Sequence, residues 1–398
     1  MSGSETASSG SATLWSLALY QLLASNRGGL FVVYMPLFLV EARGASDALA
    51  LGIVSAGYVL ASLTGPLAGR WSDRVGRRKP FLLVGEIGSF PLFLAIPFLP
   101  GVWASGGAFI AAQIVLSFAA PALNAFVADV SSQTSRGAGY GLLNATSSWG
   151  GIVGFVVAAV LVVPFGLNVV FYFVAAVMVG TVLVVSTWVP DLRLPPTTTR
   201  RPWREYRAVT VFATAVSIRS LGAGAVATFY GVNALALGAN NLDVSIIAIS
   251  GMAAAGCVSI PFGRFIDRRG EIRGIFYGTM IMLVGLLFFL FATNWVWFVP
   301  GQTLRWVGFA LMGPGMLAFV SRLAPVGHRA EYLGVFSLVN SSMWSVGPLL
   351  GGVCLLLGGA PALYGFAFGS TLVSIAAIEG IYRLPARSAS PPGEVGPA

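Results

Sequence analysis

Gly65-Pro-Leu-Ala-Gly-Arg-Trp-Ser-Asp-Arg-Val-Gly-Arg-Arg-Lys79 is a cationic stretch between two long apolar runs. Glycine at 69 and 76 allows backbones to approach closely and permits positive φ, and Asp73 can cap the start of a helix. The arginines and the lysine favour the anionic cytoplasmic face of a membrane. The stretch is therefore expected to be a tight loop at a membrane surface.

The composition is that of a polytopic membrane protein. Hydrophobic residues make up 56% of the 398 residues, charged residues 9%, and the mean hydropathy is +0.83, which excludes two or three soluble domains. Cys257 and Cys354 lie far apart in apolar runs, so no disulfide framework is indicated. With one histidine in the chain, no metal site and no other cofactor is expected. The net charge of +9 does not indicate nucleic acid, because the cations fall in alternate loops.

A membrane-spanning helix needs about 20 mostly apolar residues, and twelve such runs can be placed. The expected spans are 14–40, 48–70, 80–99, 103–128, 137–163, 166–189, 208–238, 243–265, 273–293, 296–321, 331–358 and 361–383. With both termini inside, all but four of the 23 lysine and arginine residues fall in cytoplasmic segments. The positive-inside rule therefore predicts a multi-pass protein of the cytoplasmic membrane with both termini cytoplasmic.

The chain repeats itself at a long period, which indicates two six-helix halves related by duplication. The stretch 69–76 recurs at 263–270, an offset of 194, and 121–127, Arg136 and Arg27 recur at 314–320, Arg329 and Arg219, offsets of 192 to 193. The predicted organisation is a disordered cytoplasmic tail over 1–13, an N-terminal bundle over 14–189, a cytoplasmic linker over 190–207, a C-terminal bundle over 208–383 and a cytoplasmic tail over 384–398.

The spacing Gly-x-x-x-Asp-Arg-x-Gly-Arg-Arg over 69–78 resembles the loop between the second and third helices of the major facilitator superfamily (MFS). Together with the second copy of the motif and the duplicated architecture, the resemblance covers nearly the whole chain. It implies an all-α membrane protein with twelve transmembrane helices in two pseudo-symmetric six-helix bundles, which works by alternating access about a central site.

In that family the residue at the place of Asp73 meets the start of the eleventh helix, and a loop arginine pairs with an acid at the end of the fourth. Asp129 is the matching acid here, and Arg77 is its expected partner. Such contacts would hold the halves together on the cytoplasmic side. The second copy has Glu271 and Ile272 at the places of Arg77 and Arg78, so the first copy is expected to matter more. The expected gate residues are Gly69, Asp73, Arg74, Gly76, Arg77, Arg78, Asp129, Asp267 and Arg268; the alternative is a loop that only sets topology.

Three arginines, Arg27, Arg219 and Arg305, fall inside expected spans. Arg27 lies about 20 Å along its helix from Leu14, near the midplane. Facing lipid, each would cost at least about 2.5–3.5 kcal/mol, so they should face protein or a water-filled cavity. All three stand on the first, seventh and tenth spans, which line the central cavity in the MFS family. The pair Arg27 and Arg219 resembles the binding pair of the organophosphate/phosphate antiporters of this superfamily.

Such a cavity favours anions, because a guanidinium presents a bidentate fork to a carboxylate or a phosphate. The alternative is that each arginine binds helix-end carbonyls and is buried for structural reasons. Glu86 lies about 10 Å into the third span, counted from Lys79. It is either a proton carrier that couples transport or a structural ion pair or hydrogen-bond partner. Weaker candidates for ligand contact, most of which are expected to pack between helices, are Asn26, Tyr34, Asn124, Asn144, Trp149, Tyr230, Asn233, Asn340 and Trp344.

The sequence favours secondary active transport of a small organic anion. Protons or a counter-transported anion are the candidate coupling partners, membrane lipids surround the protein, and a monomer is expected. No Ser/His/Asp, Cys/His or paired-carboxylate arrangement indicates an enzyme, and a channel would not need the duplicated loop. The alternative within transport is proton-coupled efflux of a neutral or cationic drug or sugar, although the fourth span lacks the basic residue of that branch. The alternative outside transport is a membrane sensor or scaffold without turnover.

Overall fold

The computed structural model describes residues 3–132, 135–194, 203–325 and 327–383, and within them every regular element is a helix. The helices are α1 (Gly3–Glu41), α2 (Asp47–Val75), α3 (Lys79–Ala95), α4 (Gly101–Leu116), α5 (Ala119–Val130), α6 (Arg136–Phe165), α7 (Asn168–Thr187), α8 (Arg207–Ala236), α9 (Asn241–Arg269), α10 (Glu271–Leu290), α11 (Phe298–Leu323) and α12 (Arg329–Arg383). Short 3₁₀ turns occur at Ile96–Phe98, Trp203–Tyr206 and Trp295–Trp297. Extended pairing in the described part of the chain is a single bridge between Arg77 and Arg193.

The expected spans correspond closely to these helices. Ten stretches of the described residues are long and apolar enough to cross a membrane. The last of them, Arg329–Gly380, contains the final two expected spans, and non-helical backbone at Gly358 and Gly359 divides α12 between them. α4 and α5 together fill the expected fourth span, 103–128.

The predicted tails and linker compare with the structure in different ways. The expected disordered tail over 1–13 is not what the structure has from residue 3 onward, because α1 already begins at Gly3. A Ser/Gly-rich composition favours disorder, but helix can extend from a long apolar segment into such residues. The tail over 384–398, and residues 195–202 of the expected linker, lie outside the described residues.

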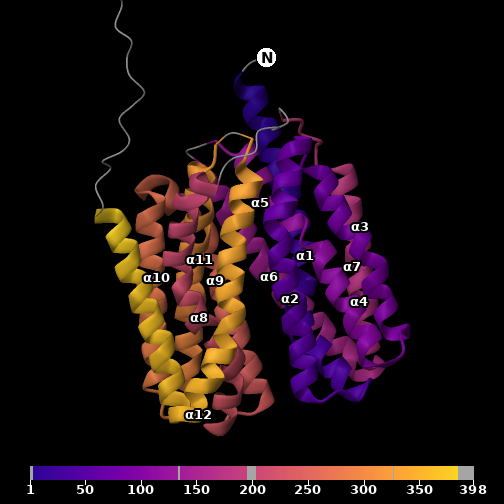
Figure 1. Cartoon of the computed structure of the whole chain (residues 1–398), viewed down its shortest axis with the longest axis vertical. Helices are drawn as coiled ribbons and strands as arrows, with labels where there is room; N and C mark the ends of the chain where they lie inside the picture. The colour runs from indigo at the N-terminus through magenta and orange to yellow at the C-terminus, as the bar shows by residue number, and fades with distance from the viewer. Residues whose placement is uncertain (1–2, 133–134, 195–202, 326, 384–398) are drawn as a thin grey trace, which may run out of the picture.

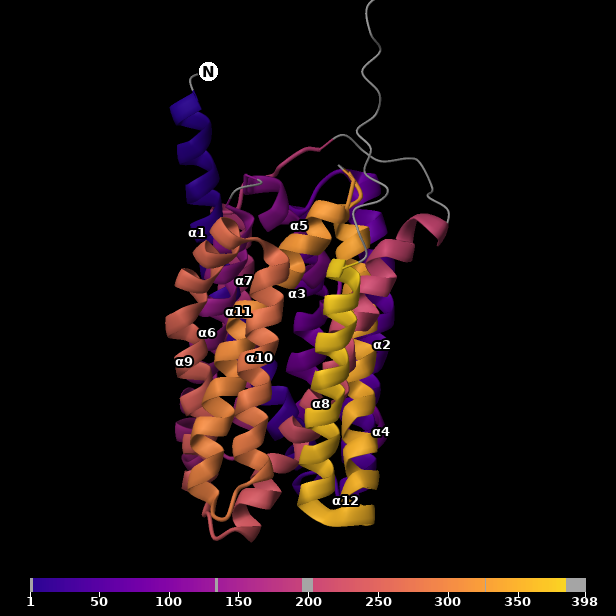
Figure 2. The same ribbon diagram turned by 90° about the vertical axis from the view of Figure 1, so that its left-hand side faces the viewer.

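The helices form two groups that lie side by side (Figure 1), and the rotated view in Figure 2 shows the long axes running roughly parallel. The first group holds α1–α7 and the second holds α8–α12. Contacts between the groups come chiefly from α2 against α12 and from α6 against α9. Because both contacts recur at the motif offset, they define the approximate two-fold relation of the halves.

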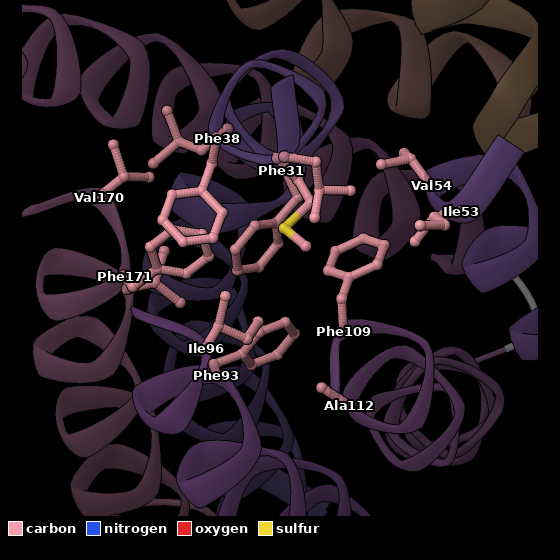
Figure 3. Packing of buried hydrophobic residues seen from close by; sticks show 14 of the residues in the cluster. Phe31, Phe38, Ile53, Val54, Phe93, Ile96, Phe109, Ala112, Val170 and Phe171 are labelled. Atoms are coloured by element: carbon pink, nitrogen blue, oxygen red, sulfur yellow. The ribbon is translucent and has the colours of Figure 1, made fainter. Parts of the chain in front are cut away.

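One core cluster of the first group lies at the end away from the turn that follows α2, and a second, with Phe81 and Val189, lies near that turn. Phe31 of α1 stacks on Phe93 of α3 with ring centroids 4.5 Å apart and meets Phe109 of α4 edge-on at 5.7 Å (Figure 3). Phe38 meets Phe171 of α7 edge-on at 4.8 Å. These rings fix the rotation of α1 about its axis, and that rotation decides which neighbours Arg27 can reach.

Candidate functional site

One buried carboxylate ties the end of α2 to the start of α12. Asp73 accepts hydrogen bonds from the backbone N–H groups of Ala330, at 3.4 Å, and Glu331, at 2.8 Å. The first N–H groups of a helix lack intrahelical partners and carry partial positive charge, so a carboxylate there is stabilising. A Cβ atom on Gly69 would overlap with the carbonyl oxygen of Ala330, so only glycine allows this approach. We call this contact the first seam.

The second copy of the motif makes the same contact in the opposite direction. Asp267 of α9 accepts from the backbone N–H groups of Gly137, at 2.7 Å, and Ala138, at 2.8 Å, in the first turn of α6. A Cβ atom on Gly263 would overlap with the carbonyl oxygen of Gly137. We call this contact the second seam. The cap and the glycine are therefore retained in the copy that was expected to matter less, although two neighbouring arginines are replaced.

Asp129, at the end of α5, binds two arginines, and one of them, Arg329, comes from the other half. It accepts from Arg329 at 2.7 Å and from Arg78 at 3.1 Å, and Arg78 also bonds Asp73 at 2.7 Å. The prediction that Arg77 pairs with Asp129 is wrong. Arg78 is the loop residue that turns into the bundle, with 1% of its side chain exposed. Arg77 lies at the surface, because adjacent residues at this turn point in different directions.

Arg77 instead pairs with Asp191, which follows α7. The guanidinium of Arg77 holds the pKa of the Asp191 carboxyl below its usual range. Gly76 ends α2 with a φ of 66°, a conformation that glycine adopts without strain. Arg74 and Arg268, two further gate candidates, are exposed.

The structure brings Arg27 and Glu86 together as a buried ion pair between α1 and α3. Two guanidinium nitrogens of Arg27 lie 2.5 and 2.6 Å from the two oxygens of Glu86. The hydroxyl groups of Tyr20 and Thr181 each donate to the same carboxylate at 2.8 Å. The Glu86 side chain is fully buried, and that of Arg27 is 6% exposed. Four donors therefore surround one carboxylate, and the charge of Arg27 is met by Glu86.

Arg219 of α8 and Arg305 of α11 have no such partner. Neither takes part in an ion pair among the described residues, and the Nε atoms of both are buried without a hydrogen bond there. In the described part of the chain, the hydrogen-bond partner of Arg219 is the sulfur of Met316, at 3.8 Å. Arg305 donates to the side chain of Gln302 at 2.5 Å and to the carbonyl oxygen of Ala223 at 3.4 Å. Two positive charges are thus buried without a carboxylate.

The two arginines lie in the same region of the C-terminal half. Ala223, which Arg305 contacts, lies four residues beyond Arg219 on α8, a rise of about 6 Å. The ring of Phe289 lies 5.8 Å from the Arg305 guanidinium, and Tyr230 and Tyr364 are its electrostatic neighbours. This part of the C-terminal half therefore holds two buried guanidinium groups without a carboxylate partner among the described residues.

The polar and aromatic candidates mostly bind neighbouring helices. Asn340 accepts from Ser217 at 3.2 Å and from Ser220 at 3.0 Å, and Asn144 donates to Ser259 at 2.8 Å. The other contacts are Asn26 to the carbonyls of Leu22 and Leu23, Asn124 carbonyl to Tyr140, Asn233 to Tyr364, and Trp149 against Gly256. Trp344 is exposed and Tyr34 is half-buried. Tyr230, beside Arg305, is the member of this set that joins the arginine site.

Sequence reasoning missed several partners. Glu331 receives the side chain of Arg70 at 2.6 Å across the first seam, and Gln302 orients Arg305. Gln302 could have been found, because it lies one helical turn before Arg305. Tyr20, Thr181 and Asp191 carry no comparable signal, since their positions relative to their partners depend on how the helices pack.

With this geometry described, comparison with known proteins identifies the class. The family model of the Major Facilitator Superfamily matches residues 17–227 and 210–397. The chain therefore belongs to the major facilitator superfamily and is a multi-pass membrane transporter with the twelve-helix fold of that family.

Its relatives are distant. It is 26% identical over 325 residues to Multidrug resistance protein 1 of Bacillus subtilis, covering 76% of this chain and 80% of that protein. An uncharacterized MFS-type transporter of Methanocaldococcus jannaschii is 28% identical, but the match spans only 33% of this chain and 34% of that relative. The crystal structure of the human organic anion transporter MFSD10 superposes with a TM-score of 0.71 at 17% identity, covering 93% of this chain and 99% of that one.

Proposed function

We propose that this transporter moves a small organic anion by secondary active transport, with alternating access about a site in the C-terminal half. The observation that carries the proposal is the pair Arg219 and Arg305, both buried and both without a carboxylate partner among the described residues. A buried, unpaired charge is costly, so two of them in the same region of the C-terminal half favour a bound anion. The solved organic anion transporter supports only the fold, because its identity to this chain is low.

The anion site is asymmetric between the halves. The sequence expectation gave Arg27 and Arg219 matching roles, but Arg27 is already neutralised by Glu86. Substrate charge is therefore met by Arg219 and Arg305, with Gln302 holding the Arg305 guanidinium in place. Glu86 acts as the structural counter-ion of Arg27. A proton or a counter-transported anion then drives transport, and the coupling involves a residue other than Glu86. Flux assays must identify the coupling ion and that residue.

Alternating access would use the two seams. Closed seams hold the ends of α2 and α9 against the starts of α12 and α6, so this end of the bundle is shut in the structure. By the positive-inside rule this end is the cytoplasmic one, with both termini on the same side. Opening requires both caps to break while substrate is released. The working unit in this proposal is a monomer in the cytoplasmic membrane.

Efflux of a drug is the second candidate, favoured by the relative named Multidrug resistance protein 1. A thermal-shift screen of the purified protein separates the two, because a ligand that binds only the folded state raises stability by RT ln(1 + [L]/Kd). We expect small carboxylates or phosphate esters to raise the unfolding temperature of the wild type and to lose that effect in Arg219→Gln and Arg305→Gln. A response to lipophilic cations alone would contradict the anion proposal and support drug efflux.

A further inference from the structure

The two seams differ in charge although their caps are the same. In the first seam, Arg70 is paired with Glu331 at 2.6 Å, and Arg329 with Asp129 at 2.7 Å. Cations and acids therefore balance across the contact. The residues at the corresponding places of the second seam, 193 or 194 positions away, are Arg264 for Arg70, Ala138 for Glu331, Arg136 for Arg329 and Arg322 for Asp129. The second seam thus keeps both cations and loses both acids.

Arg322 forms an ion pair with a different acid. It lies 3.2 Å from Glu271, at the start of α10. In the first seam the end of α5 carries the acid Asp129 and the start of α3 carries the cation Arg78. In the second seam the end of α11 carries the cation and the start of α10 carries the acid, so the polarity of the pair is reversed. The reversal neutralises Arg322, and no acid of the described residues forms an ion pair with Arg136.

Arg136 is consequently a buried cation that forms no ion pair with the described residues. Only 6% of the residue is exposed, and its Nε atom has no hydrogen-bond partner in the described part of the chain. Asp129 and Glu271 act on it electrostatically but form no ion pair with it, and Arg329 adds a repulsive positive charge. Its symmetry mate Arg329, by contrast, binds both Asp129 and the carbonyl oxygen of Ala128. Burying an unpaired guanidinium costs free energy that a bound anion would offset.

We propose that the second seam binds a phosphate group, held by Arg136 and Arg322 at the place that the Asp129 carboxylate occupies in the first seam. A phosphate has enough acceptor oxygens to serve two guanidinium forks at once. Arg322 has 53% of its side chain exposed and Arg264 is exposed, so the site opens toward the surface at the end of the helices. That is the level of lipid headgroups in a membrane protein. The phosphate belongs either to an anionic phospholipid or to a soluble phosphate, and the site is independent of Arg219 and Arg305.

The test measures the unfolding temperature of the full chain in neutral detergent against three additions: phosphatidylglycerol, inorganic phosphate, and phosphatidylcholine as the reference for a general lipid effect. We expect phosphatidylglycerol or inorganic phosphate to raise it in the wild type. The apparent affinity should fall at least about tenfold in Arg136→Gln, which loses charge-assisted hydrogen bonds. Arg273→Gln removes an exposed arginine near the same end of α10 and should respond like the wild type.

A second variant keeps Arg136 and tests the same idea if Arg136→Gln fails to fold. The double exchange Glu271→Arg with Arg322→Asp preserves that ion pair and supplies Arg136 with the acid that Arg329 has. It should be insensitive to both phosphate probes. A response to phosphatidylglycerol alone identifies the lipid as the source, and a response to inorganic phosphate identifies a soluble one. The proposal is overturned if neither probe acts, if Arg136→Gln or the double exchange responds like the wild type, or if Arg273→Gln loses as much as Arg136→Gln.

Discussion

Replacing Glu86 by glutamine should destabilise the N-terminal half strongly, because it leaves Arg27 charged and buried. The carboxylate has four donors and is fully buried. Removing one partner of a buried ion pair costs about 3–5 kcal/mol, since the remaining charge is uncompensated. Glutamine keeps the shape and one acceptor oxygen, so steric change contributes little to that loss.

A double-mutant cycle isolates the pair. Arg27→Gln should also be costly, because it leaves the carboxylate of Glu86 buried with only two hydroxyl donors. The double variant, Arg27→Gln with Glu86→Gln, carries no buried charge and should lose less than the sum of the two single variants, with a coupling free energy of at least about 1 kcal/mol. The assay is equilibrium unfolding in a mixed-detergent titration, with the amount of folded protein followed by gel filtration.

The outcome decides between the two roles proposed for Glu86 from the sequence. A structural ion pair predicts a large single-variant loss and strong coupling. A proton carrier that is neutral for part of the transport cycle predicts that Glu86→Gln is tolerated and that transport loses its dependence on the pH gradient. A loss below about 1 kcal/mol in Glu86→Gln, or additive losses in the cycle, would refute the ion-pair account.

Three further predictions concern the end of the bundle at which the seams close. Asp73→Asn and Asp267→Asn should each lower stability by about 0.5–2 kcal/mol, as lost helix caps do. Each should also increase cysteine labelling across the seam that the replaced aspartate forms. If only Asp73→Asn has this effect, the second cap is dispensable. Gly69→Ala and Gly263→Ala should each prevent the closed contact and increase the same labelling, with Gly365→Ala, where a Cβ meets nothing within 4 Å, as the control. Asp191→Asn should destabilise the folded protein at neutral pH only, because Arg77 lowers the pKa of Asp191 in the folded state. The contribution of Asp191 to stability is present above the ordinary carboxyl pKa of about 3.9 and is lost as pH falls through the lower folded value. A stability difference from the wild type that persists in strong acid would contradict this prediction.

The first seam could be anticipated because its residues match the loop motif of the family, and the repeat pointed to a second copy of that motif. Asp73, Gly69 and their copies at Asp267 and Gly263 recur at a fixed offset, and a carboxylate facing a helix start has one obvious use. The partner of Asp129 was misjudged because Arg77 and Arg78 are adjacent, and only the turn geometry decides which of them points inward.

The ion pair of Arg27 with Glu86 could not be assigned from sequence for a different reason. Spans such as α1 and α3 are apolar on most faces, so hydrophobic periodicity does not fix how each helix is rotated. That rotation is set by packing of rings such as Phe31 on Phe93, which involves residues far apart in the chain. Glu271 and Arg322 can likewise be read from the sequence, but the sequence does not show that their side chains form an ion pair.

The central claim is that Arg219 and Arg305 bind the transported anion, and counterflow of a labelled anion in proteoliposomes tests it most directly. The anion is the one that most raises the unfolding temperature of the wild type. We expect Arg219→Gln and Arg305→Gln each to lower uptake at limiting concentration by at least about tenfold, since each loses charge-assisted hydrogen bonds, while Arg273→Gln transports as the wild type does. Wild-type rates in both folded arginine variants would contradict the claim.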